Sequence, residues 1–309
     1  MVVIVGPSAV GKTSIAIQLA KCLKAEIISA DSTLLYKGMN IGTAKPGEAE
    51  IQDIPHYLID VAEPDKPWSL AEYIRAAYSI IAEIHNRRQL PIIAGGTGQY
   101  IRALLENWEI PKSAPNPQLR TALMNWLQEI GPGALFTRLQ FIDPATAESI
   151  DFRNQRRIIR ALEVIFQTGR RFSDQRKSNL PPYRFLVIGL KRSRQELYQR
   201  VDRRIQGMID SGFVDEVRHF MDLGYSPKLP VFSAIGYREM FDYLKGRIDL
   251  ETAIVQMKKR TRRFIRHQTN WFKPDDPKIR WFDVTDEIVE QLAVEIRQWL
   301  ECNYSMQRK

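Results

Sequence analysis

The sequence predicts an α/β fold in which a parallel sheet, with helices on both of its faces, is interrupted by an all-helical domain. Short β-branched runs at 2–5, 27–30 and 90–94 alternate with amphipathic helical patterns at 14–23 and 68–88. Strand-like runs are absent between about 113 and 182, where prolines and helical patterns dominate. "RFLVIGL" then returns to the sheet, so the expected parts are 1–113, 114–181 and 182–309.

Local signals support several of these elements. A capping box formed by Ser69 and Glu72 opens the 68–88 helix, and Ser193 with Glu196 predicts the same device for the helix after "RFLVIGL". From about 226 to the end the pattern is helical, apart from one strand-like piece at 279–282. The second and third parts therefore add mainly helices to the sheet.

Composition narrows the class of protein. The chain has 309 residues, 44% of them hydrophobic, and a formal net charge of +9, which is compatible with a polyanionic partner without requiring one. No run approaches the length of a membrane span, and Met1 leads directly into a strand. Only Cys22 and Cys302 are present, far apart, so a reducing compartment and a cytoplasmic, membrane-free protein are expected.

The phosphate-binding pattern G-x-x-x-x-G-K-[ST] occurs between the first strand and the first helix. Its residues are Gly6, Pro7, Ser8, Ala9, Val10, Gly11, Lys12 and Thr13. In that context backbone amides converge on an anion at a helix N-terminus, Lys12 reaches a terminal phosphate, and the Thr13 hydroxyl is the expected Mg²⁺ ligand. The motif indicates phosphate binding but does not separate a kinase from other phosphate-handling enzymes.

Two further groups lie at the same predicted edge of the sheet. Asp31 follows the second strand, where open α/β sheets place their ligands, and is either a general base or a cap of the following turn. Gly95-Gly96-Thr97-Gly98 follows the 90–94 strand and is either a tight turn or a close approach of backbone to ligand.

Two basic clusters indicate a nucleic-acid surface. Arg153, Arg156, Arg157 and Arg160 lie in the helical insertion. Six Lys or Arg occur between Lys258 and Arg266, interleaved with Phe264 and followed by Trp271 and Phe272. Positive charge next to aromatic rings is typical of single-stranded or looped RNA binding. The alternative for either cluster is a solvated helix face.

Taken together, these segments resemble the tRNA dimethylallyltransferase family. The resemblance is carried, in order along nearly the whole chain, by "GPSAVGKT", "DSTLLYKGMNIGTAKP", "GGTGQY", "NQRRIIRALEV", "SGFVDEV", "AIGYRE" and "RHQTNWF". It implies a P-loop NTPase-like core, Mg²⁺, dimethylallyl diphosphate as donor, and N6 of adenine 37, next to the tRNA anticodon, as acceptor. A monomer is expected, with the anticodon stem-loop as its partner.

The resemblance also assigns roles by matching positions. Asp31 looks like the base, Arg204 and Lys12 like holders of the diphosphate, and Thr97 and Arg120 like tRNA contacts near the reacting base, with Thr97 in the catalytic set. The expected tRNA lining comprises Asp31, Ser32, Thr33 and Leu34, then Arg156, Arg157, Ile158, Ile159 and Arg160, then Ser233, Ala234, Ile235, Gly236, Tyr237 and Arg238.

Three alternatives remain at this point. A small-molecule or nucleoside kinase would use the same loop, Mg²⁺ and strand-end carboxylate. A nucleotide-gated RNA-binding protein would use the basic clusters without catalysis. Adenylate-using relatives share the phosphate loop, so a free adenine nucleotide is a further candidate acceptor.

Overall fold

The computed structural model describes residues 1–51, 53–111, 113–175 and 179–306. The chain forms two compact units. The first combines residues Met1–Leu105 with Tyr183–Lys309, and the second is Glu106–Pro182. The insertion expected at 114–181 falls within this second unit, which begins earlier, at Glu106.

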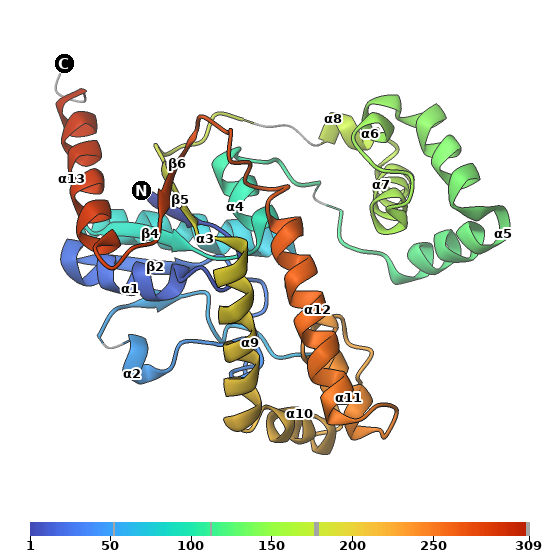
Figure 1. Ribbon diagram of the computed structural model, residues 1–309. Helices are drawn as coiled ribbons and strands as arrows, with labels where there is room; N and C mark the ends of the chain where they lie inside the picture. Colours follow the sequence, from blue (N-terminus) through green and yellow to red (C-terminus); the bar gives the residue numbers. More distant parts are fainter. Residues whose placement is uncertain (52, 112, 176–178, 307–309) are drawn as a thin grey trace. The chain divides into compact units, whose positions relative to one another are not determined.

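The first unit is built on a six-stranded sheet in which every neighbouring pair is parallel (Figure 1). The strands are β1 (Val2–Val5), β2 (Ala25–Ser29), β3 (His56–Tyr57), β4 (Leu90–Ala94), β5 (Leu186–Lys191) and β6 (Ile279–Asp283), in the spatial order β3-β2-β4-β1-β5-β6. The parallel sheet predicted from the alternation of strands and helices is therefore confirmed. Sequence reasoning missed β3, because a two-residue edge strand carries no periodicity.

The sheet is covered by helices of the first unit. These are α1 (Lys12–Leu23), α3 (Leu70–Asn86), α4 (Gly98–Leu105) and α13 (Ile288–Met306). The short helix α2 (Glu48–Ile51) has no buried residue and contacts α1. Helix α1 contacts α13, and α3 contacts α4. Because parallel crossovers are right-handed, the opposite directions of β1-to-β2 and β3-to-β4 place α1 and α3 on opposite faces.

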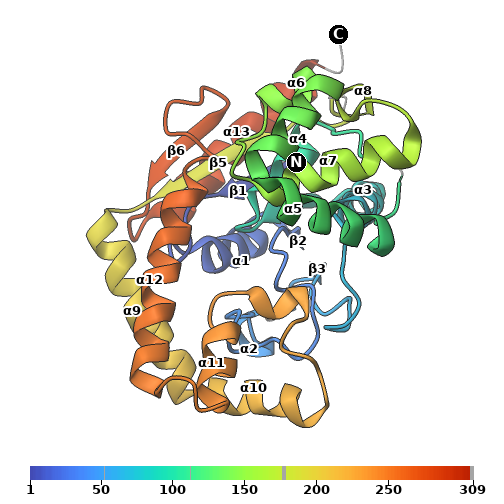
Figure 2. The same ribbon diagram turned by 90° about the vertical axis from the view of Figure 1, so that its right-hand side faces the viewer.

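The remaining elements of this unit form a helical extension. They are α9 (Arg194–Asp210), α10 (Phe213–Asp222), a 3₁₀ turn at Pro230–Ser233, α11 (Tyr237–Leu244) and α12 (Leu250–Gln268). Helices α9 and α12 lie side by side (Figures 1 and 2). This arrangement carries basic side chains of both helices to one end of the sheet.

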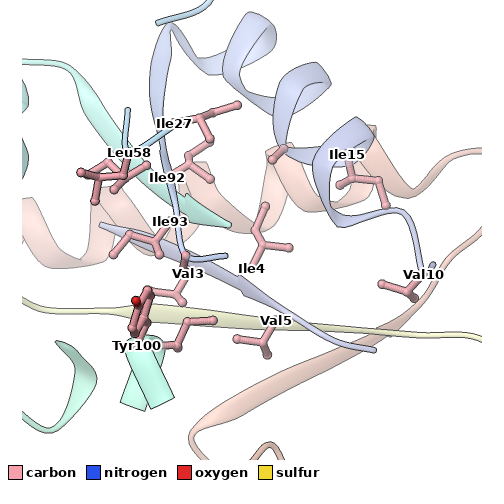
Figure 3. Packing of buried hydrophobic residues seen from close by; sticks show 14 of the residues in the cluster. Val3, Ile4, Val5, Val10, Ile15, Ile27, Leu58, Ile92, Ile93 and Tyr100 are labelled. Carbon is pink, nitrogen blue, oxygen red and sulfur yellow. The ribbon is translucent and has the colours of Figure 1, made fainter. Parts of the chain in front are cut away.

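The core of the first unit consists of the strand side chains and the helix faces that cover them. Strand β1 is buried along its whole length, and its side chains pack with Ile15 of α1 and with Ile92 and Ile93 of β4 (Figure 3). Burial on both faces explains why β1 reads as a continuous apolar run. Because the sheet is packed on both faces, it fixes the positions of the loops at the carboxyl ends of its strands.

Helix boundaries follow the capping chemistry. At α3 both halves of the predicted box form, with Ser69 and Glu72 each accepting from the other's backbone N–H. At α9 the Ser193 hydroxyl accepts from Glu196 N–H, but the Glu196 carboxylate pairs with Arg192 instead of returning to the cap. The prediction at α9 was therefore right for the serine and wrong for the glutamate, because a nearby guanidinium competes successfully for the carboxylate.

In the described residues of the second unit, helices joined by loops are the regular elements. The unit contains α5 (Pro117–Ile142), α6 (Pro144–Glu148), α7 (Gln155–Thr168) and α8 (Phe172–Gln175). Helix α5 is kinked where Gly131 takes a positive φ of 79° before Pro132. A separate apolar cluster, including Leu135, Leu139, Ile158 and Leu162, holds these helices together.

Candidate active site

The two glycine-containing loops lie where the chain connections from two neighbouring strands run in opposite directions along the sheet. The chain leaves β1 toward β2 and leaves the neighbouring β4 toward β5, on the other side of the sheet. Loops at such a switch point lie outside the carboxyl ends of the strands, where open α/β sheets bind ligands. The phosphate loop (6–13) follows β1, and the second glycine loop (95–98) follows β4. The topology therefore places both predicted loops at one site.

The phosphate loop is shaped by backbone geometry and by Lys12. Gly6 has a φ of 147°, and a Cβ there would meet the Leu190 carbonyl oxygen at 2.6 Å, so no other residue fits. The Lys12 ammonium donates to the Gly6 and Pro7 carbonyls at 3.0 and 2.9 Å. Helix α1 begins after Gly11 without a side-chain cap, which leaves its first amides available to an anion.

Arginines from outside the loop fix its other carbonyl groups. Nε of Arg200, on α9, donates to the Ala9 carbonyl at 2.7 Å, and Nε of Arg192 donates to the Val10 carbonyl at 3.1 Å. These two hydrogen bonds hold the loop in one conformation. The guanidinium groups also place positive charge beside it. Sequence reasoning did not find Arg192 or Arg200, because the contacts span more than 180 positions.

Asp31 lies beside the second glycine loop. Strands β2 and β4 pair with Ser29 level with Ala94, so Asp31 and Gly96 emerge together. One carboxylate oxygen, Oδ1, accepts from the Thr33 N–H at 3.0 Å and from its hydroxyl at 2.7 Å. Among the described residues no donor contacts the other oxygen, Oδ2, which faces Gly96. Asp31 thus caps a turn with one oxygen and keeps the other free.

Thr97 joins the two strand exits. Its hydroxyl oxygen accepts from the Ser32 N–H at 2.9 Å and lies 3.2 Å from the Ser32 hydroxyl, while its own N–H donates to the Ala30 carbonyl at 3.0 Å. Gly98 is required by packing, because a Cβ there would lie 2.2 Å from Cγ of Trp271. The "GGTG" segment is therefore a close approach of backbone to side chains as well as a turn.

Lys12, Asp31 and Arg204 form the charged centre of the site. Burial lowers the pKa of Lys12 to about 8, while the Asp31 carboxylate raises it and the Arg204 cation lowers it. Burial also lowers the pKa of Arg204, and Asp31 opposes that shift. Arg204 keeps solvent-exposed surface and stays cationic, since a guanidinium is not deprotonated in proteins. Two cations and one carboxylate thus interact across the sheet edge.

The lowered pKa of Lys12 predicts a pH-dependent affinity for anions. Above pH 8 the free site loses the Lys12 proton, and an incoming diphosphate must restore it, so affinity falls as pH rises through 8, by up to about tenfold per pH unit. Calorimetric titration with inorganic diphosphate between about pH 7 and 9.5 measures this slope. Lys12→Met, titrated in parallel, corrects for the ionisation of diphosphate itself; equal slopes in the two proteins would contradict the prediction.

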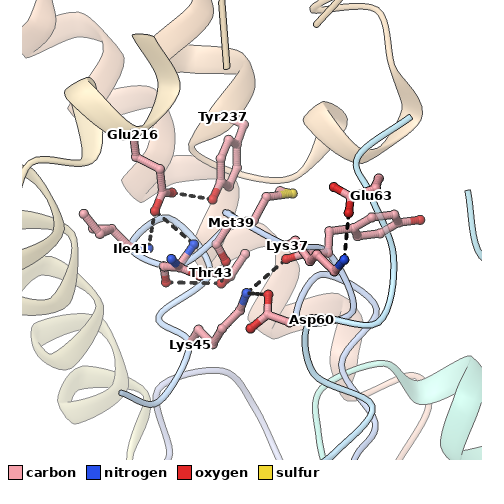
Figure 4. A network of polar contacts seen from close by, with 11 residues as sticks. Lys37, Met39, Ile41, Thr43, Lys45, Asp60, Glu63, Glu216 and Tyr237 are labelled. Carbon is pink, nitrogen blue, oxygen red and sulfur yellow. Dashed lines mark hydrogen bonds and ion pairs between the residues drawn. The ribbon is translucent and has the colours of Figure 1, made fainter. Parts of the chain in front are cut away.

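The segment 40–43, part of "NIGTAKP", is held by a carboxylate from α10 (Figure 4). Glu216 accepts from the backbone N–H groups of Asn40, Ile41 and Gly42 at 2.9, 2.6 and 3.1 Å, and from the Tyr237 hydroxyl at 2.6 Å. The next carbonyl, that of Thr43, accepts from Arg204 at 3.0 Å. Glu216 therefore supports the backbone that orients Arg204, a role that local sequence patterns do not reveal.

Loss of the Glu216 charge is expected to destabilise the protein. Glu216→Gln places amide hydrogens against backbone donors, and hydrogen bonds to charged groups contribute about 1.5–3 kcal/mol each, so the free energy of unfolding should fall by about 2 kcal/mol or more. Urea unfolding measures the change. Asp215→Asn, one position earlier and exposed, is the control and should stay within about 0.5 kcal/mol of the parent. Equal midpoints for the two variants would refute this role of Glu216.

The predicted tRNA-contacting residues of the first unit differ widely in exposure. Asp31, Ser32, Thr33 and Thr97 lie together at the site, whereas the Leu34 side chain is buried. In the segment 233–238 only Ser233 and Arg238 are exposed. The Tyr237 side chain is fully buried and bonded to Glu216, so a direct contact of that side chain with RNA is excluded in this conformation. Its role here is structural.

In the second unit, the predicted residues divide in the same way. Arg156 and Arg157 are exposed, while Ile158 and Ile159 are buried in the apolar cluster, so their side chains are not available to RNA. Arg120 and Arg160 both pair with the buried Glu163, at 2.7 and 2.8 Å. Burial raises the pKa of Glu163, but hydrogen bonds from the two arginines and from Asn116 N–H outweigh it and lower that pKa.

Helix α12 carries the second basic cluster. Arg260 pairs with Glu239, and Arg262 pairs with Asp202 at 2.7 Å, whereas Lys259 and Arg263 are exposed. Phe264 is exposed beside these cations, as a stacking platform requires. Phe272 is buried in the core, so the expectation of a platform is wrong for that ring. Trp271 is partly buried and packs against Gly98.

Fold and site together define a P-loop α/β enzyme whose phosphate loop and Asp31 carboxylate lie at one edge of the sheet. A family model described as IPP transferase matches residues 34–275. The tRNA dimethylallyltransferase of Roseiflexus sp. (strain RS-1) is 44% identical over 301 residues, covering 97% of this chain and 99% of that protein. This chain belongs to the IPP transferase family.

Solved structures agree with this assignment. The tRNA isopentenylpyrophosphate transferase of Bacillus halodurans is 37% identical, with a TM-score of 0.75, and the match covers 100% of this chain and 99% of the other. A eukaryotic dimethylallyltransferase described as acting on tRNA is 26% identical, with a TM-score of 0.81 and coverage of 100% and 80%. The sequence-based recognition of the family is confirmed. No helix among the described residues is long and apolar enough to span a membrane.

Proposed function

We propose that this enzyme transfers a dimethylallyl group from dimethylallyl diphosphate to N6 of adenine 37, next to the anticodon of tRNA, and releases diphosphate. One observation carries the proposal: the phosphate loop and Asp31 leave the same edge of the sheet, where the charges of Lys12 and Arg204 act on Asp31. A diphosphate held by the two cations would therefore face a carboxylate with a free oxygen. That arrangement suits a reaction in which the anion leaves and a proton is accepted.

The chemistry requires charge stabilisation on one side of the reacting carbon. The bond between C1 of the allyl group and the diphosphate oxygen breaks, and negative charge grows on the departing diphosphate. The backbone amides at the start of α1, the Lys12 ammonium and the Arg204 guanidinium are placed to stabilise it. These groups are fixed before the reaction, because carbonyl contacts hold the loop and the Thr43 contact holds Arg204.

On the other side, a weak nucleophile must be positioned and deprotonated. The conjugated N6 amine forms the new bond to C1, and its proton passes to Oδ2 of Asp31, the oxygen that no described residue contacts. Thr33 keeps the carboxylate oriented through Oδ1. The hydroxyl of Thr97, tied to Ser32, sets the position of the turn that carries Asp31.

The residues present fit Mg²⁺. The Thr13 hydroxyl is exposed at the first turn of α1 beside Lys12, and the described residues contain no cluster of three or more His, Cys, Asp or Glu that would hold a metal alone. This donor set suits an ion that is shared between one protein oxygen, water and diphosphate oxygens. When bound by Thr13, Mg²⁺ would neutralise charge on the leaving diphosphate.

Exposed basic groups support tRNA as the acceptor. Arg156 and Arg157 in one unit, and Lys259, Arg263 and Arg238 in the other, are exposed cations suited to phosphates. Lys12, Asp31, Thr97 and Arg204 all come from one chain, so the catalytic centre needs no second copy and we expect a monomer.

Product analysis tests the proposal. The purified enzyme, Mg²⁺ and dimethylallyl diphosphate are incubated in parallel with an anticodon stem-loop containing adenine 37, with the same stem-loop carrying guanine there, and with AMP. Mass spectrometry of the nucleosides should show N6-dimethylallyladenosine only in the first reaction, with one diphosphate released per product. Modification of AMP alone would identify a free nucleotide as acceptor, and ATP-dependent phosphorylation would identify a kinase; either outcome overturns the proposal.

A further inference from the structure

Gln268, the last residue of α12, bridges the two loops of the site. Its Oε1 accepts from the Ser8 N–H of the phosphate loop at 2.7 Å, and its Nε2 donates to the Gly96 carbonyl of the second glycine loop at 3.1 Å. The side chain is only 4% exposed. When both polar atoms of a buried amide bond to backbone atoms, the side chain fixes the separation of those backbone atoms.

The amide of Gln268 satisfies both members of this pair of backbone groups. Ser8 offers a donor and Gly96 offers an acceptor, so the bridging side chain must present one acceptor and one donor at the reach of glutamine. A glutamate has no donor for the Gly96 carbonyl, and a methionine of similar size has neither a donor nor a strong acceptor. The two contacts also determine the orientation of the amide group.

The bridge joins the two chemical halves of the reaction. The phosphate loop carries Lys12 and the amides for the diphosphate, and Gly96 lies between Gln268 and Asp31. A Cβ on Gly96 would lie 3.0 Å from Nε2 of Gln268 and 3.6 Å from Oδ2 of Asp31. Gln268 therefore contacts the backbone on either side of the space between donor and base, and touches neither Lys12 nor Asp31 itself.

We propose that Gln268 is a positioning residue that holds the donor loop and the base loop at the separation required for transfer. The inference rests on the proposed function. Each loop keeps its own ligand contacts without the bridge, because Lys12 and Arg200 hold the phosphate loop and Thr97 holds the base side. Loss of the bridge therefore changes the alignment of two bound substrates more than the binding of either one.

Loss of the bridge should therefore lower the rate of transfer much more than the affinity for either substrate. Misplacement of about 1 Å between reacting groups costs about 10²-fold in rate. For Gln268→Met we expect the single-turnover rate with saturating substrates to fall by about 10²-fold, with the affinities for inorganic diphosphate and for the stem-loop within about threefold of the parent. Gln268→Asn keeps both polar groups on a shorter side chain and should lose about tenfold.

The experiment compares these variants with Gln256→Met, an exposed position on the same helix. Single-turnover rates are measured with enzyme in excess over an anticodon stem-loop, and affinities for inorganic diphosphate and for the stem-loop are measured separately. Thermal unfolding of every variant shows whether the fold is retained. If Gln268→Met does not fold, the rate and affinities of Gln268→Asn decide.

Two results would overturn the inference. A Gln268 variant as fast as Gln256→Met would show that the bridge does not align the substrates. A variant with parental single-turnover rate but reduced affinity for diphosphate or for the stem-loop would show that Gln268 serves one loop only. Failure of the parent enzyme to form N6-dimethylallyladenosine would instead refute the proposed function, so the two failures are distinguishable.

Discussion

Asp31→Asn is expected to lower the rate of the chemical step by about 10²-fold or more while leaving tRNA binding nearly unchanged. The substitution keeps a side-chain oxygen for the two hydrogen bonds from Thr33, so the turn at the end of β2 is retained. It removes the basicity of Oδ2, the oxygen without a donor among the described residues. A loss confined to the rate therefore reports proton transfer and not folding.

Single-turnover kinetics with the anticodon stem-loop, together with the equilibrium affinity for that stem-loop, measure this effect. Asp65→Asn, in an exposed loop, is the matched control for the loss of one negative charge. Asp31→Ala removes the contacts to Thr33 as well, and should be at least as slow. If rate and stem-loop affinity fell by the same factor in Asp31→Asn, the residue would be an RNA ligand and its assignment as base would be wrong.

The sheet and the two loops could be predicted because their signals are local. Strand β4 was predicted with its observed bounds, Leu90–Ala94, since an apolar run ends in a glycine turn. The phosphate loop carries its own spacing, and the Ser69 cap needs only the residue three positions on. Each of these features is determined by interactions within a few positions of the chain, where sequence patterns are informative.

The contacts that support the site could not be predicted in this way. Glu216 meets segment 40–42 across more than 170 positions, and Gln268 meets Ser8 across 260. Nothing near Glu216 distinguishes it from Asp215, which is exposed and pairs with Arg218 on the same helix. The distinction is made by the fold, which brings three unpaired backbone N–H groups to one carboxylate and none to the other.

Some residues that the family resemblance assigned to tRNA contact have side chains buried in the protein core. Tyr237 and Ile158 were expected to line tRNA, yet both side chains are buried. In each case the neighbouring arginine, Arg238 or Arg157, is exposed. A motif in a family therefore joins ligand-contacting and structural residues in one string, and only burial separates them.

The "NIGTAKP" segment illustrates the same point for the catalytic centre. In the structure the segment supports Arg204: Glu216 accepts from its backbone N–H groups (Figure 4), and the Thr43 carbonyl accepts from the Arg204 guanidinium. Gly42 is needed for packing, since a Cβ there would lie 2.1 Å from the Phe213 ring. The motif thus supplies the backbone that positions Arg204, the residue proposed to bind the leaving diphosphate.

Lys12→Met is expected to lower kcat/KM for the dimethylallyl donor by about 10²–10³-fold, the effect typical of removing one preorganised donor from a site of developing negative charge. Methionine preserves most of the side-chain volume but not the ammonium that lies within reach of Asp31 and Arg204. The Gly6 and Pro7 carbonyls also lose their donor, so a part of the effect arises from loop geometry.

A second substitution tests the other cation of the site. Arg204→Lys keeps a positive charge but not the planar fork that bonds the Thr43 carbonyl, and should cost less than Lys12→Met. Lys21→Met, at an exposed position of α1, is the control and should retain the parental kcat/KM. Stem-loop affinity, measured without the donor, should be unchanged in all three variants, because no diphosphate is then present for these cations to bind. Parental kcat/KM in Lys12→Met would show that the diphosphate departs from another part of the protein.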